Sequence, residues 1–113
     1  MKITIKLAFV CALALSVSLL FAAAKGDAKK GKDLFATKCS QCHGEKGEGK
    51  PAIAKMFNVT LKPLAGTEAQ GKTDDQLTKI IVNGNGKMKP VKLSETEAAD
   101  TIAFLRTLAT EKK

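Results

Sequence analysis

The residues with the most reactive chemistry lie in one short stretch, Cys39-Ser40-Gln41-Cys42-His43. Two thiols three positions apart, followed at once by an imidazole, form the attachment pattern of c-type haem. Each thiol can form a thioether with one vinyl group of the porphyrin, and the imidazole can then bind the iron from one face. The chain has three cysteines and one histidine, so this stretch uses nearly all of its strong metal ligands.

Three other interpretations of these cysteines are weaker. A zinc site needs four ligands, but Cys42 and His43 are adjacent and no further Cys or His pair follows. A thioredoxin-like redox pair would require a βαβ pattern, which the sequence does not show. A plain disulfide between Cys39 and Cys42 stays open for an exported chain.

If His43 binds one face of the iron, the opposite face needs another ligand or stays open. No second histidine exists, so a methionine thioether is the remaining choice. Met88 is favoured, because its glycine-rich loop can pass flat across a porphyrin face and Pro90 stiffens the exit. Met56 sits beside Ile53 and Phe57, an apolar setting that predicts core packing instead.

Three segments with helical signals must position these residues. Apolar residues recur at spacings of three and four from Asp27, a plausible N-cap, to about Lys38. Capping-box patterns open two further helices, at Thr73-Asp74-Asp75-Gln76 and at Ser94-Glu95-Thr96-Glu97. Asn83-Gly84 is a typical end for the second helix.

Between these segments the composition predicts loops. Residues 44–51 are rich in glycine, residues 85–90 contain Gly86 and Pro90, and residues 58–69 contain Pro63 and Gly66 but little periodicity. One short helical turn is predicted for residues 52–57. No strand-like alternation is present, so the sequence predicts an all-α fold: three main helices with long loops wrapped around one covalently attached haem.

The first 24 residues have the pattern of a cleaved secretory signal peptide. Lys2 and Lys6 precede an apolar run that ends at Ala22-Ala23-Ala24, a small-residue cleavage site. A retained membrane anchor is the alternative, although the run is near the lower length limit for a spanning helix. Residues 25–113 are then one monohaem domain, exported and most simply periplasmic in a bacterium.

The net charge of +8 limits the kinds of partner that the chain is expected to bind. Loss of Lys2 and Lys6 with the signal lowers it to +6, spread over a surface with interspersed acidic residues. One arginine and no exposed aromatic set argue against nucleic acid as a partner. The lysines favour either steering toward acidic protein partners or simple solubility, and the two interpretations carry equal weight.

The chain resembles class I c-type cytochromes of the small soluble monohaem type, from Lys25 to Ala109. The resemblance rests on Gly31, Phe35, Cys39-Ser40-Gln41-Cys42-His43-Gly44, the stretch from Gly84 to Pro90, and Ala103-Phe104-Leu105-Arg106. It implies that the first and last helices cross where Gly31 and Phe35 meet Phe104. It also implies that a proline carbonyl after the motif, best matched by Pro51, accepts a hydrogen bond from the haem histidine. In many relatives proline directly follows the methionine, whereas Lys89 intervenes here.

These observations predict a monomeric electron carrier, with haem c held by Cys39 and Cys42 and the iron held by His43 and Met88. Its partners would be redox proteins with acidic docking surfaces, and no membrane insertion is expected after signal cleavage. A haem-based sensor or gas-binding module, with an open or displaceable sixth position, is the alternative. An enzyme is disfavoured, because no spare histidine or arginine pair is available for acid–base chemistry beside the haem.

Overall fold

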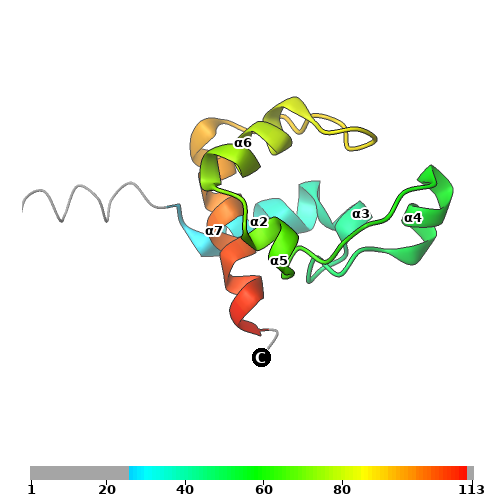
Figure 1. The fold of residues 1–113 in the computed structure, drawn as a ribbon. Helices are drawn as coiled ribbons and strands as arrows, with labels where there is room; N and C mark the ends of the chain where they lie inside the picture. The colour runs from blue at the N-terminus through cyan, green and yellow to red at the C-terminus, as the bar shows by residue number, and fades with distance from the viewer. Residues whose placement is uncertain (1–25, 112–113) are drawn as a thin grey trace, which may run out of the picture.

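The computed structural model describes residues 26–111, so the predicted signal peptide lies outside the described residues (Figure 1). These residues form six helices and, among them, no strand: α2 Ala28–Lys38, α3 Ser40–His43, α4 Pro51–Phe57, α5 Thr67–Gln70, α6 Asp74–Asn83 and α7 Glu95–Glu111. The all-α prediction is confirmed, and α2, α6 and α7 are the three main helices. Within the described range, no helix is both long and apolar enough to cross a membrane.

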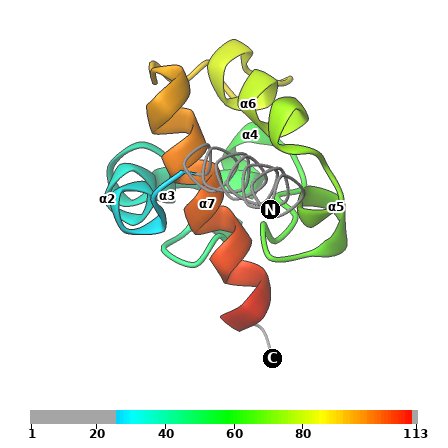
Figure 2. The ribbon, with the colours of Figure 1, turned by 90° about the vertical axis from the view of Figure 1, so that its left-hand side faces the viewer.

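The centre of the fold is the crossing of α2 and α7, visible in Figures 1 and 2. Gly31 is buried in α2, and a Cβ atom built on it would lie 1.8 Å from the Asp100 carbonyl oxygen of α7. Glycine is therefore the residue that allows this close approach. One turn further on, the rings of Phe35 and Phe104 are tilted by 51° with centroids 5.2 Å apart. The expected crossing of the first and last helices and the contact of Phe35 with Phe104 are confirmed, whereas Gly31 meets the backbone of Asp100 and not Phe104.

Side-chain caps begin the three main helices where the sequence predicted them. The Asp27 carboxylate accepts hydrogen bonds from the amides of Lys29 and Lys30. Thr73 and Gln76 form a complete capping box at the start of α6. Ser94 and Glu97 exchange the same pair of bonds, at 3.1 and 3.0 Å, at the start of α7.

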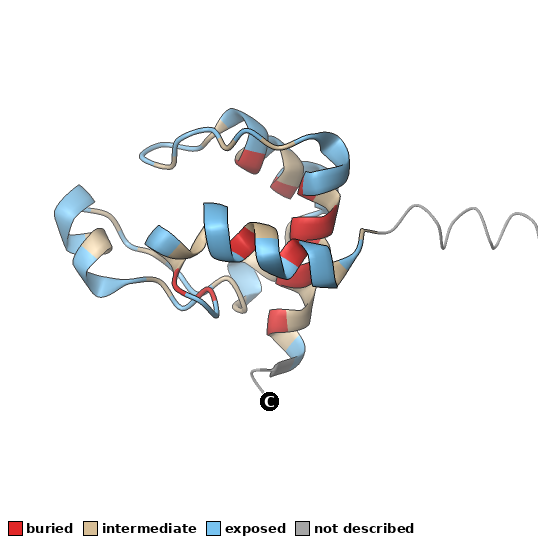
Figure 3. Ribbon diagram, turned by 180° about the vertical axis from the view of Figure 1, so that it is seen from behind, coloured by how far each residue is buried: buried red, intermediate tan, exposed pale blue. Residues whose placement is uncertain are grey.

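Apart from Ala98, the buried apolar residues in the described part of the chain form two separate small clusters. One joins α2 to α7 and has Cys39, Leu64 and Ala65 packed against it; its members are Phe35, Phe104, Leu105 and Leu108. The other joins α6 to α7, with Val91 and Leu93 at its edge; its members are Leu77, Ile81 and Ile102. Both clusters depend on α7, and Figure 3 shows buried segments on α2, α6 and α7 and in the loop that follows α3.

Three short helices complete the chain, and two of them were not predicted. Ser40–His43 and Thr67–Gln70 are helical over only four residues each, too short for periodicity to reveal. The segment 58–69, predicted as loop throughout, therefore ends in a helical turn. The helical turn predicted at 52–57 is present as α4, which has no buried residue and extends away from the α2–α7 crossing (Figures 1 and 3).

Candidate functional site

The two thiols and the histidine lie on one helical turn directly after α2. Cys39 ends α2, its amide donating to the Phe35 carbonyl at 2.9 Å, and the next four residues form α3. The His43 amide donates to the Cys39 carbonyl at 3.1 Å. Residues three and four apart share a helix face, so this turn gathers Cys39, Cys42 and His43 on one side.

Burial distinguishes the three side chains. The pKa of the Cys39 thiol rises to about 11 because it is buried and because Cys42 lies close by. Burial also lowers the pKa of His43, which favours the neutral imidazole that binds metals. Both cysteines are free thiols, and Cys42 is exposed. The site thus presents two reduced thiols and one neutral imidazole on a single turn.

The Nδ1 atom of His43 is buried and has no hydrogen-bond partner among the described residues. The hydrogen bond that His43 was expected to donate to the Pro51 carbonyl is therefore not formed in this structure. Pro51 is the first residue of α4, where a carbonyl points along the helix axis toward the amide four residues later. In the described part of the chain, His43 Nδ1 is the one buried side-chain nitrogen or oxygen atom without a hydrogen-bond partner.

Met88 is held at the base of a tight hairpin between α6 and α7. Its amide and carbonyl exchange two hydrogen bonds with Asn85, both of 2.9 Å. Gly84 has φ +82°, and a Cβ atom there would lie 2.8 Å from the Met88 carbonyl oxygen. The Val91 amide donates to the Ile81 carbonyl at 2.8 Å, which ties the exit of the hairpin back to α6. The backbone of Met88 is therefore fixed, and its side chain is half-buried.

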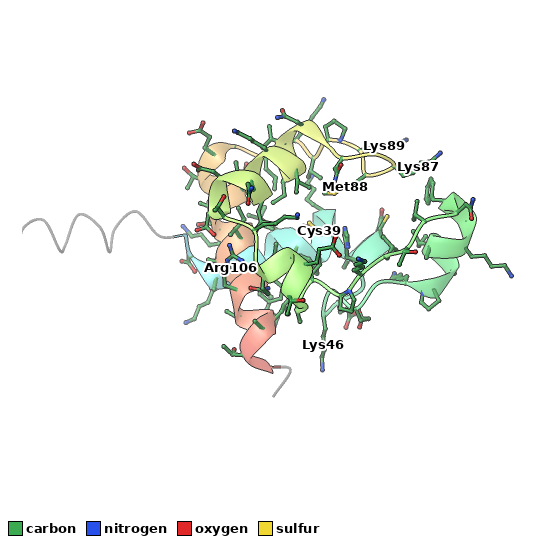
Figure 4. All side chains as sticks on the ribbon, viewed as in Figure 1. Cys39, Lys46, Lys87, Met88, Lys89 and Arg106 are labelled. Atoms are coloured by element: carbon green, nitrogen blue, oxygen red, sulfur yellow. The ribbon has the colours of Figure 1, made fainter. Side chains whose placement is uncertain are left out.

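Lys87 and Lys89 flank Met88 and are exposed (Figure 4). Neither forms an ion pair with any described residue. In Figures 1 and 3 the hairpin and α4 extend from the body toward the same side, the side on which α3 lies. Positive charge is therefore concentrated at the tip of the loop that carries Met88.

The prediction for Met56 was wrong. Met56 is 70% exposed, so it is not core filler. The local pattern with Ile53 and Phe57 is apolar, but α4 packs none of its residues into either buried cluster. A short apolar segment predicts burial only where another element covers it.

The glycine-rich loop after the motif is built from backbone contacts. The Gly49 amide donates to the His43 carbonyl at 2.6 Å, and the Lys50 amide donates to the Cys42 carbonyl at 3.0 Å. Gly44, Gly47 and Gly49 all have positive φ. These bonds fold the loop back onto α3 and hold the main chain of the two site residues in place.

The residues present fit a covalently attached haem. Cys39 and Cys42 form no disulfide, burial favours the neutral imidazole by lowering the pKa of His43, and the buried Nδ1 of His43 lacks a partner among the described residues. The two buried clusters are small, and three large apolar side chains remain exposed: Met56, Phe57 and Val82. A large rigid apolar group would give such side chains a packing partner. A protein-only metal centre does not fit, since the described residues contain no cluster of three or more His, Cys, Asp or Glu side chains.

An all-α chain with a Cys-x-x-Cys-His turn at the end of its first main helix defines a c-type haem protein. Comparison with known proteins gives the family. Residues 28–109 match the family model described as Cytochrome c, and this chain belongs to the cytochrome c family. Membership implies a covalently bound haem c with its iron, the group through which cytochromes c transfer electrons.

Cytochrome c-L of Methylorubrum extorquens is 38% identical over 75% of this chain and 42% of its own length. Cytochrome c-554(547) of Halothiobacillus neapolitanus is 28% identical over 74% of this chain and 98% of its own length. FixP, a Cbb3-type cytochrome c oxidase subunit of Azorhizobium caulinodans, is 34% identical over 81% of this chain and 32% of its own length. The chain thus spans less than half of two of these relatives and nearly all of the third.

A solved structure agrees with the family. Cytochrome cL from Hyphomicrobium denitrificans superposes with a TM-score of 0.54 at 30% identity, covering 70% of this chain and 45% of that one. The cytochrome c fold predicted from the sequence is therefore confirmed.

Three polar residues with structural roles around α7, namely Gln70, Asp100 and Thr101, were not singled out from the sequence, and Arg106 was named only as part of the family resemblance. Asp100 and Thr101 are buried in α7, where the Asp100 carboxylate accepts from the Asp27 amide at 2.7 Å. Gln70 and Arg106 join the segment before α6 to α7 through side-chain hydrogen bonds. One signal was available: Arg106 is the single arginine of the chain and lies in an otherwise apolar stretch of the last helix.

Proposed function

We propose that this protein is a soluble, exported electron carrier that transfers single electrons through a haem iron held by His43 and Met88. The main observation behind this proposal is the hairpin between α6 and α7, which holds the backbone of Met88 in place. Two backbone hydrogen bonds with Asn85 fix Met88, the methionine that lies outside every buried cluster yet is half-buried. A methionine ligand requires a fixed backbone, because the weak bond between its sulfur and the iron cannot also order a mobile loop.

Each residue has a defined role in this proposal. Cys39 and Cys42 would hold the porphyrin through thioethers, and His43 and Met88 would hold the iron from opposite faces. When bound, the haem supplies the one-electron redox couple, and a Met/His ligand pair raises its reduction potential. If His43 and Met88 both bound the iron, they would exclude water and substrates from it and leave it as an electron carrier.

The surface supports brief encounters with acidic redox proteins. Lys87 and Lys89 are exposed beside Met88, and the full chain has a net charge of +8. Weak redox complexes use small interfaces, and complementary charge mainly accelerates association. The donor and acceptor are thus proposed to be redox proteins with acidic docking surfaces. A monomer exported to a bacterial periplasm through the signal at residues 1–24 completes the proposal, with no role for nucleic acid or a membrane anchor.

The axial ligand can be tested by absorption spectroscopy of the ferric holoprotein. We expect a far-red thioether–iron band that disappears in Met88→Ala and persists in Met56→Ala, the matched control at the other methionine. Native protein that lacks the band and binds carbon monoxide readily would overturn the carrier proposal and support the sensor or gas-binding alternative.

A further inference from the structure

Arg106 forms a group of hydrogen bonds that lies outside the haem motif. Its Nη1 donates to the Gln70 carbonyl at 3.1 Å and to Gln70 Oε1 at 3.4 Å. Its Nη2 donates to the Lys72 carbonyl and to Asp74 Oδ1, both at 2.7 Å. The Arg106 side chain is 32% exposed, so these bonds are only partly screened by water. The planar guanidinium of Arg106 in α7 therefore binds three positions along the chain, two just before α6 and one at its first residue.

Gln70 continues the connection. Its Nε2 donates to the Leu105 carbonyl of α7 and to the Leu64 carbonyl, both at 2.9 Å. The side chain thus joins α7 to the segment that precedes α5. We call Arg106 and Gln70, with these bonds, the clamp.

Leu64 connects the clamp to the loop that follows the haem motif. The Leu64 amide donates to the Gly47 carbonyl at 2.8 Å. Gly47 is buried, and a Cβ atom there would lie 2.9 Å from the Leu64 Cβ, so the two residues are in close contact. Leu64 also packs on the buried cluster that Cys39 joins.

From Gly47 the connection reaches the histidine in a few residues. The Gly47 amide donates to the Gly44 carbonyl at 3.1 Å, and the Gly49 amide donates to the His43 carbonyl at 2.6 Å. The main chain of His43 is thus held from both sides, by the helical turn before it and by the folded loop after it. The imidazole itself has no hydrogen-bond partner at Nδ1 among the residues described.

We propose that Arg106 and Gln70 are positioning residues for the haem histidine. They hold residues 64–72 on α7, residues 64–72 hold the 44–50 loop, and that loop fixes the orientation of His43. The proposal rests on the proposed function only in taking His43 as an iron ligand. It does not depend on Met88.

The test uses the holoprotein and two variants. Gln70→Met keeps the size of the side chain and removes both donated bonds, whereas Arg106→Lys keeps the charge but loses the fork. Glu68→Gln is the matched control: it is a similar change two positions from Gln70, in an exposed ion pair outside the clamp. Native-state amide hydrogen exchange measures the connection, and hyperfine-shifted haem methyl resonances of the ferric protein report the orientation of the histidine ring.

In both variants we expect exchange at the Leu64 and Gly49 amides to accelerate about tenfold, the effect of losing about 1.4 kcal/mol. Exchange at Val91, whose amide is bonded to α6, should stay unchanged, and the haem methyl shifts should move. Glu68→Gln should change none of these readings.

Two results would overturn the proposal. Exchange that accelerates equally at Leu64, Gly49 and Val91 would show general loss of stability instead of a directed connection. Faster exchange at Leu64 and Gly49 with unchanged haem methyl shifts would show that the clamp holds the loops but not the histidine. A missing far-red band in the native protein would refute the Met88 assignment while leaving this comparison valid.

Discussion

Gly31→Ala tests whether the closeness of α2 and α7 determines the stability of the fold. A Cβ atom at position 31 would lie 1.8 Å from the Asp100 carbonyl oxygen, whereas real Cβ contacts essentially never fall below 3.0 Å. That oxygen belongs to backbone, so no side-chain rotation relieves the contact and the two helices must separate by about 1 Å. The separation also weakens the packing of Phe35 on Phe104.

The magnitude follows from two opposing effects. Forcing an extra methyl into a packed contact typically costs about 1–3 kcal/mol, and here the obstacle is rigid, so the upper end applies. Alanine gains about 1 kcal/mol over glycine within a helix. The expected net change is a loss of about 2 kcal/mol in the free energy of unfolding, which lowers the melting temperature by roughly 10 °C for a domain of this size.

Urea and thermal denaturation of the holoprotein, followed by far-ultraviolet circular dichroism, measure this change. Ala36→Gly is the control, since Ala36 is exposed on the same helix and its replacement should cost only about 1 kcal/mol of helix propensity. A Gly31→Ala protein as stable as the native protein, or more stable, would refute the reasoning.

Three further predictions concern the loops and caps. Gly84→Ala should weaken the far-red band of the ferric protein, because a methyl group at φ +82° meets the Met88 carbonyl; an unchanged band would mean that the hairpin adapts freely. The hydrogen bond and charge of Lys62 lower the pKa of Glu68, so carboxyl NMR should give a midpoint below the usual glutamate value, and Lys62→Met should raise it. This pair stabilises the fold above the unfolded-state pKa of Glu68, and its contribution is lost as the pH falls through the lowered folded-state value. Ser94→Ala should lower the free energy of unfolding, measured by urea denaturation, by about 1 kcal/mol, because it removes the cap of α7. An unchanged free energy of unfolding would show that this cap does not stabilise the fold.

The sequence was sufficient wherever the determinant is local. Asp27, Thr73 and Ser94 cap helices through bonds that span only two or three residues, so their pattern alone predicts them. The Cys39–His43 stretch likewise contains its own chemistry. The closeness of Gly31 to α7 was also predictable, but only through resemblance to a family in which these helices cross.

What the sequence could not predict depends on contacts between distant segments. Met56 has apolar neighbours in sequence, yet whether anything covers it depends on where α4 points, and it is 70% exposed. Thr101 is polar and fully buried, because its hydroxyl donates to the Glu97 carbonyl one turn earlier. The bond from Gln70 to Leu105 joins residues 35 positions apart, and no local pattern encodes such a pairing.

The α2–α7 crossing has a further consequence, for the timing of folding. Phe35 and Phe104 are about 70 positions apart, so their contact closes almost the whole described domain in a single loop. Both buried clusters also require α7, and neither can form before that helix is synthesised. The first main helix thus has no packing partner until α7 is available. Folding of this chain is therefore a late event, and substitutions at the crossing should slow it more than substitutions in α4 or α5.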